Sequence, residues 1–162
     1  MTTRKLNYIL IIASVFLASC ASPPQNPSEV VDSLKFGHKV VWIGQFAFAK
    51  QTTTAKGEPL VIGVFRYLKA DVSEFSADFS KAKFPIVAKE VDNGYFSIDT
   101  VFPRKDVKAA SKIQQNYEKL SPFVLVKGTP ENVIEVKARS VVRLRVEKAM
   151  AIKKNQIKLT AD

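Results

Sequence analysis

Alternating apolar positions are the clearest pattern in this chain, and they recur in separate segments along it. In residues 39–48, Val40, Trp42 and Phe46 stand on one face, and further apolar residues stand on the opposite face. Period-two alternation is typical of a β-strand, and two apolar faces are typical of a strand inside a barrel or a sandwich. The same pattern predicts strands in these further ranges: 60–68, 86–91, 95–102, 123–127, 133–136 and 141–152.

The segments between the predicted strands carry turn-forming residues. Asn93 and Gly94 separate two strand patterns, which predicts a tight hairpin because both residue types tolerate positive φ. The strands at 39–48 and 60–68 are expected to pair as another hairpin with a long connection. Loops, turns or irregular crossings are predicted in these ranges: 51–59, 69–84 and 128–130.

One segment has the apolar spacing of a helix. Val107 and Ala110 begin a series that recurs at helical spacing, and Asp106 can cap its start, which predicts one principal helix over residues 106–120. The order of strands, one helix and further strands resembles the OB-fold, a barrel whose helix plugs one end between the third and fourth strands. The resemblance covers about residues 39–154 and implies a mainly β, OB-like barrel.

The N-terminal residues have the proportions of an export signal. Arg4 and Lys5 precede an apolar run over residues 6–17, which is shorter than the roughly 20 residues needed to span a bilayer. The Leu-Ala-Ser-Cys order that ends at Cys20 resembles the lipobox of bacterial lipoprotein precursors. That resemblance implies cleavage between Ser19 and Cys20, a thioether-linked diacylglycerol on Cys20 and an acyl chain on the new amino terminus. An uncleaved anchor with an incidental Cys20 is the alternative.

The residues after the predicted cleavage site are rich in proline. Residues 21–28 hold three prolines and no apolar residue larger than alanine, which favours a disordered, extended tether. Ser28 can cap one short helical turn that follows. The predicted organisation is a signal peptide over 1–19, a lipidated tether over 20–35 and a single β-rich, OB-like domain over 36–162.

Two resemblances bear on where the protein is found. In bacteria with two membranes, lipoproteins with aspartate after the cysteine are retained at the inner membrane, so Ala21 implies an outer-membrane anchor with the domain facing the periplasm. In a host with one membrane, the same anchor would hold the protein on its outer face. The Val-Val-Trp-Ile-Gly order at residues 40–44 and a later Val-Lys-Gly are similar to the Slp-type, starvation-inducible outer-membrane lipoproteins. No functional residue is carried over from that similarity.

The composition indicates one globular domain and excludes some kinds of site. A chain of 162 residues with 46% hydrophobic and 25% charged residues has the balance of one globular domain. Cys20 is the single cysteine and His38 the single histidine, which excludes an internal disulfide and a Cys/His zinc site. His38 is expected to be a surface histidine rather than a catalytic base.

Basic residues are concentrated toward the C-terminal end. The formal net charge is +10, and removal of Arg4 and Lys5 with the signal peptide leaves +8. Strand alternation directs the arginines of the last long strand outward. These residues form a candidate face for an anionic ligand or for docking, here called the basic face: Lys137, Arg139, Arg143, Arg145 and Lys153. A solvated face that only keeps the protein soluble is the alternative.

The sequence contains no motif of a common enzyme class. Gly-x-Ser-x-Gly, the phosphate-binding loop and His-Glu-x-x-His are all missing, so we expect no enzyme and no cofactor beyond the lipid on Cys20. The first hypothesis is a membrane-anchored lipoprotein that acts as a structural or interaction component of a cell-envelope assembly. The second is a module that binds an anionic glycan, lipid headgroup or polymer through the basic face. Export argues against nucleic acid as a partner.

Overall fold

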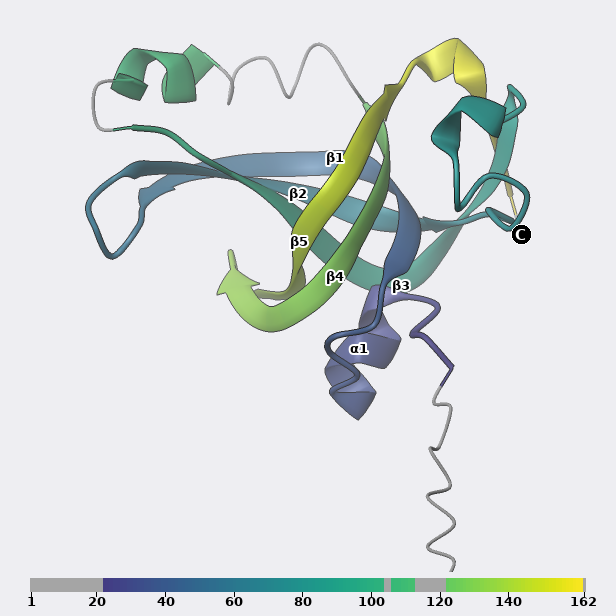
Figure 1. The fold of residues 1–162 in the computed structure, drawn as a ribbon, viewed down its shortest axis with the longest axis horizontal. Helices are drawn as coiled ribbons and strands as arrows, with labels where there is room; N and C mark the ends of the chain where they lie inside the picture. Colours follow the sequence, from purple (N-terminus) through teal and green to yellow (C-terminus); the bar gives the residue numbers. More distant parts are fainter. Residues whose placement is uncertain (1–21, 104–105, 113–121, 162) are drawn as a thin grey trace, which may run out of the picture.

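Six β-strands make up most of the structure, a computed structural model that describes residues 22–103, 106–112 and 122–161 (Figure 1). The strands are β1 (Val40–Thr53), β2 (Pro59–Lys69), β3 (Ile86–Val101), β4 (Phe123–Val136), β5 (Arg139–Ile152) and β6 (Ile157–Thr160). The helical elements are α1 (Pro27–Ser33) and the 3-10 turns η1 (Phe79–Lys81) and η3 (Lys154–Gln156), and residues 107–112 are also helical.

The first five strands close into a barrel. β1 pairs antiparallel with β2 and with β4, β2 pairs antiparallel with β3, and β4 pairs antiparallel with β5. A parallel pairing of β3 with β5 closes the ring, so the order around the barrel is β1-β2-β3-β5-β4. This is the strand arrangement of an OB-fold, and the prediction of a mainly β, OB-like barrel is confirmed. β6 extends the sheet by pairing parallel with β3.

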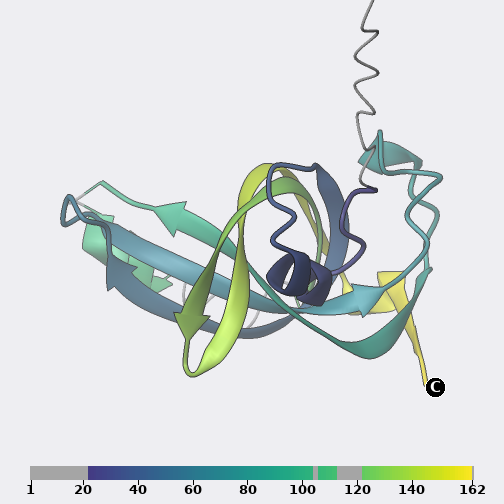
Figure 2. The ribbon, with the colours of Figure 1, turned by 90° about the horizontal axis from the view of Figure 1, so that it is seen from below.

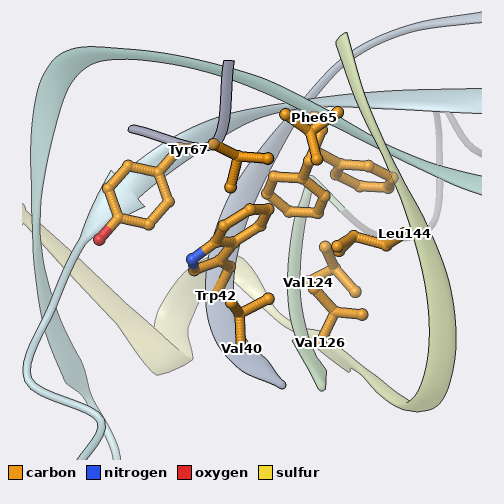
Figure 3. Close-up of a cluster of buried hydrophobic side chains, with 10 residues drawn as sticks. Val40, Trp42, Phe65, Tyr67, Val124, Val126 and Leu144 are labelled. Atoms are coloured by element: carbon orange, nitrogen blue, oxygen red, sulfur yellow. The ribbon is translucent and has the colours of Figure 1, made fainter. Parts of the chain in front are cut away.

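Aromatic rings fill the barrel. Trp42, Phe65 and Phe96 are each at most 1% exposed. The ring centroids of Phe65 and Phe96 lie 5.7 Å apart in a stacked arrangement, and those of Trp42 and Phe96 lie 5.5 Å apart. Gly44 of β1 makes this packing possible, because a Cβ at its position would lie 2.5 Å from the Phe96 ring and 2.7 Å from the Cβ of Phe65. Figure 3 shows the cluster around Trp42 and Phe65.

A second apolar layer lies outside the barrel, where residues 70–85 cross from β2 to β3. Phe75 and Phe79 of this crossing pack in one cluster with Ile43 and Leu68, whose side chains point away from the barrel interior. The predicted irregular crossing is confirmed, and η1 lies within it.

The predicted hairpin at Asn93 and Gly94 is wrong, because β3 runs through both residues as one strand. Glu90 and Tyr95 both pair with β2, so the residues between them form a bulge in the ladder rather than a reversal. Gly94 has a φ of 92°. The Asn-Gly pair therefore supplies the positive φ of a strand bend, which is another use of the same conformational freedom.

The predicted turn at residues 128–130 is also wrong, because β4 passes through it. The pairing of β4 with β5 shifts at Gly128 and again after Pro130. Proline has no amide donor and is tolerated in a sheet at such irregular positions. The Pro130 carbonyl accepts a hydrogen bond from the Gly37 amide at 3.1 Å. Glycine and proline thus mark irregularities in one long strand.

The helix that plugs the barrel is α1. Val30 of α1 is fully buried and belongs to the interior cluster with Trp42 and Val142. Figure 2 looks from below onto α1, which lies across that end of the barrel. The plug therefore comes from the segment before the first strand.

The helix predicted at 106–120 has a different place. Its described part, residues 107–112, puts Ala110 in a cluster with Ala49 and Val61, toward the outer end of the β1–β2 hairpin (Figure 1). The rest of that prediction, from residue 113 onward, lies outside the described residues. The expectation that this helix plugs the barrel is corrected, because apolar spacing indicates a buried face but not the surface that buries it.

The folded domain begins earlier than the predicted boundary at residue 36. Pro24 is already buried, and Asn26 rather than Ser28 caps α1 by accepting a hydrogen bond from the Glu29 amide at 2.8 Å. The tether predicted over residues 20–35 is corrected accordingly, because its second half packs against the barrel. The prolines of this segment favoured an extended tether, whereas Pro27 and Val30 of α1 are buried against the barrel.

Candidate functional site

The residues of the basic face lie at different places in and around β5. Lys137 lies in the tight turn between β4 and β5, Arg139 is the first residue of β5, and Arg143 and Arg145 point outward from the strand, as predicted. Lys153 follows the opposite end of β5 and caps η3. The structure therefore brings Lys137 close to Arg139 and Arg143 close to Arg145, but it does not gather all members of the basic face.

Two arginines of the basic face are paired with carboxylates. Arg143 Nε lies 2.5 Å from Asp99 Oδ2, and Arg145 Nη1 lies 3.3 Å from Glu131 Oε1. The first pair is partly buried, with side chains 32% and 14% exposed, whereas the second is open to solvent. Both positive charges are therefore offset within the chain, and the first pair also ties β5 to β3.

The two residues of the basic face at the β4–β5 turn, Lys137 and Arg139, lie over aromatic rings. Lys137 Nζ is 4.5 Å from the ring centroid of Phe48, and the guanidinium carbon of Arg139 is 4.8 Å from that of Tyr95. Cations at such positions are attracted by the ring faces.

Apolar residues of the β4–β5 hairpin pack on the outer face of β2. This cluster contains Leu60, Ile62, Val64, Val136 and Val141. The hairpin therefore covers the outer side of the first half of β2.

A pocket of about 600 Å³ opens between the start of β1, the end of β2 and residues 23–25. We call it the mouth pocket. It lies at the strand ends close to the plugged end of the barrel, and sequence reasoning missed it. The residues that give it chemical character are Lys39, Trp42, Tyr67, Lys69, Asp71 and Lys127. The predicted pairing of strands 39–48 and 60–68 was a usable signal, because it places Lys39 and Lys69 at the same edge of the hairpin.

The aromatic wall of the mouth pocket carries two hydrogen-bond donors. Trp42 is 1% exposed, and its indole Nε1 is buried without a hydrogen-bond partner among the described residues. Such an unpaired donor costs about 1–3 kcal/mol. Figure 3 shows this nitrogen and the Tyr67 hydroxyl on the same side of the cluster. Burial raises the pKa of the Tyr67 phenol, so at neutral pH it keeps its proton and can donate it.

Two lysines of the mouth pocket are free of carboxylate partners. Within the part of the chain that the structure describes, no acidic group lies within 4.0 Å of the ammonium of Lys69 or Lys127. Lys39 Nζ, in contrast, lies 3.0 Å from Glu147 Oε1. Asp71 is held by Ser73, whose hydroxyl and amide donate to it at 2.6 and 3.0 Å and lower the pKa of its carboxyl. The pocket therefore has an excess of positive charge.

The remaining predicted site residues are not part of these surfaces. Ser19 and Cys20 lie outside the described residues, so their processing stays a prediction. None of the helices in the described ranges has the length and hydropathy of a membrane span. Within the same ranges, no cluster of histidine, cysteine and acidic side chains is placed to bind a metal ion.

Comparisons with known proteins give little beyond the fold. No protein-family model matches the chain, and no curated protein matches it. Similar solved structures include the small single-stranded DNA-binding protein from Streptomyces coelicolor, with 13% sequence identity and a TM-score of 0.39. The match covers 71% of this chain and 92% of that protein. The similarity to Slp-type lipoproteins stays a prediction from two short segments.

Proposed function

We propose that this protein is a lipid-anchored lipoprotein of the bacterial cell envelope, and that its barrel is a structural or interaction component of an envelope assembly. The observation that carries the proposal is the short distance along the chain between Cys20 and the folded domain. Pro24 is buried and α1 begins at Pro27. Four residues of extended chain span at most about 14 Å, so a lipid on Cys20 would hold the barrel close to the membrane surface.

The form of the barrel supports a role played through its outer surface. Its interior is filled by aromatic rings and plugged by α1, and the β4–β5 hairpin covers the outer face of β2. In the described structure, β6 pairs with β3 on one side only, so its outer edge offers backbone groups to a strand of a partner. The proposal assigns no catalytic role and no cofactor beyond the lipid on Cys20.

The paired arginines do not favour the second hypothesis, an anionic ligand on the basic face. Asp99 and Glu131 already offset Arg143 and Arg145, which leaves Lys137 and Arg139 as the charges at the hairpin turn. Any anion there would compete with the Phe48 and Tyr95 rings for the same two cations.

The proposal is tested by mass spectrometry of the N-terminal peptide and by membrane fractionation. Wild-type protein should begin at Cys20 with a diacylglycerol and an acyl chain attached, and Cys20→Ala should remove the modification and release the protein from the outer-membrane fraction. In a host with two membranes, Ala21→Asp should keep the lipid and move the protein to the inner membrane. Crosslinking of the anchored form should then capture the same envelope proteins repeatedly. An unmodified, uncleaved N-terminus would refute the proposal.

A further inference from the structure

We propose that the mouth pocket binds the phosphate group of a phosphate ester, with the ammonium groups of Lys69 and Lys127 and the N–H and O–H donors of the Trp42–Tyr67 wall on its oxygens. The source of the phosphate is either a phospholipid headgroup or a soluble phosphate ester. The pocket has about 600 Å³ of space, which is within the usual range for small-molecule sites.

The charge in the pocket is set by lysines that have no carboxylate partner among the residues that the structure describes. Lys69 ends β2 and Lys127 lies in the middle of β4, opposite Val41 of β1. The pairings of β1 with both strands thus bring the two lysines to the same pocket from different strands. An ammonium group that is not already paired gains a charge-assisted hydrogen bond from an anion, which is stronger than a neutral one.

The indole of Trp42 supplies the second, independent observation. Its Nε1 is buried and unpartnered, although buried polar groups are hydrogen-bonded almost everywhere in folded proteins. Trp42 lines the pocket, so an acceptor atom placed there by a ligand would satisfy the indole N–H after a small adjustment of the wall. The Tyr67 hydroxyl offers a second donor beside it. A phosphate ester brings several acceptor oxygens to these donors at once.

The position of the pocket favours a lipid source, and this part of the inference rests on the proposed lipidation of Cys20. Pro23, Pro24 and Gln25 line the pocket, and they follow Cys20 closely in the sequence. Three to five residues of extended chain reach about 10–18 Å, so an anchored barrel would hold the pocket within reach of lipid headgroups.

Trp42 is the single tryptophan of the chain, so its fluorescence reports directly on the pocket. The experiment uses the full chain purified in micelles of a non-ionic detergent. One arm adds sn-glycerol 3-phosphate, a second adds phosphatidylglycerol to the micelles, and a third adds diacylglycerol, which has the same acyl chains but no phosphate. A saturable change with phosphatidylglycerol alone identifies a lipid headgroup, and a saturable change with glycerol phosphate identifies a soluble ester. A response to diacylglycerol equal to that with phosphatidylglycerol, or no saturable response in any arm, would overturn the proposal.

The lysine variants decide whether the pocket or the overall charge is responsible. Lys69→Gln/Lys127→Gln should raise the half-saturating concentration at least about tenfold, because two charge-assisted hydrogen bonds are lost. Lys153→Gln/Lys154→Gln removes the same charge from exposed positions outside the pocket and should leave the half-saturating concentration within about twofold. Equal losses in the two variants would show non-specific attraction and refute the site. Tyr67→Phe, which changes no charge, should also weaken binding.

The result is independent of the test of lipidation. Binding of glycerol phosphate by a chain whose N-terminus is unmodified would support the pocket and refute the anchor. A lipidated chain whose Trp42 fluorescence responds to none of the probes would support the anchor and refute the pocket.

Discussion

Arg143 Nε donates a hydrogen bond to Asp99 Oδ2, and this pair joins β5 to β3, the two parallel strands whose pairing closes the barrel. Asp99 is mostly buried, and its second oxygen, Oδ1, has no partner in the described structure. The carboxylate therefore depends on a single guanidinium. A contact of this kind contributes to the closure of the barrel rather than to a surface open for ligands.

Arg143→Ala is expected to destabilise the fold by about 2–3 kcal/mol, because it leaves the Asp99 carboxylate partly buried without its partner. The free energy of unfolding in urea measures the effect. Arg145→Ala is the matched control, since its partner Glu131 and its own side chain are well exposed, and it should cost less than about 0.5 kcal/mol. Equal costs for the two substitutions would contradict the structural role of Arg143.

Val30→Ala is expected to destabilise the fold by about 2 kcal/mol, because two methyl groups leave the interior cluster at the plugged end of the barrel. Leu34→Ala, at the end of the same helix, removes a side chain that is 69% exposed and should change the stability by less than about 0.5 kcal/mol. Thermal or urea unfolding of both variants checks the prediction. If Val30→Ala were neutral, α1 would not be part of the folded domain.

The turn between β4 and β5 offers a substitution that should stabilise the protein. Ala138 has a φ of 57°, in the left-handed region that glycine adopts without a steric cost. Ala138→Gly should therefore raise the free energy of unfolding by about 0.5–1 kcal/mol. Ala151→Gly makes the same chemical change on an exposed position within β5 and should lower it by about 0.5–1 kcal/mol. Opposite signs in urea unfolding are the expected result.

The strands were predictable because each of them buries apolar residues with a period of two. Val142 and Leu144 illustrate this, since their inward direction and the outward direction of Arg143 follow from alternation alone. The breaks between strands were less predictable. Asn93-Gly94 and Gly128-Thr129-Pro130 have the residues of turns, but long-range pairing with β2 and β5 converts them into bulges. Local conformational preference does not specify which partner strand is available.

The contacts in the candidate sites were also not predictable from the sequence, because they join residues far apart in the chain. The sequence indicated that the basic face points outward, but it could not show that Asp99 and Glu131, far away in the chain, offset two of its charges. The mouth pocket was missed for the same reason. Its lysines come from β2, from β4 and from the residue before β1, and the strand pattern predicts Trp42 to be an ordinary core residue. Only the closure of the barrel brings these side chains together.

Tyr67 makes the stability of the fold sensitive to alkaline pH. Burial raises the pKa of its phenol above the ordinary tyrosine value of about 10, so the folded state binds this proton more tightly than the unfolded state does. The resulting stabilisation is fully present below pH 10 and is lost as the pH rises through the folded-state pKa. Urea unfolding of wild-type protein and Tyr67→Phe at a series of pH values should show a steeper alkaline loss of stability in the wild type. Absorbance at 295 nm should show a phenol that ionises above the ordinary tyrosine range in the folded wild type and is missing in Tyr67→Phe. The same alkaline slope in both proteins would place the Tyr67 hydroxyl in solvent, and it would also remove one donor from the wall of the mouth pocket.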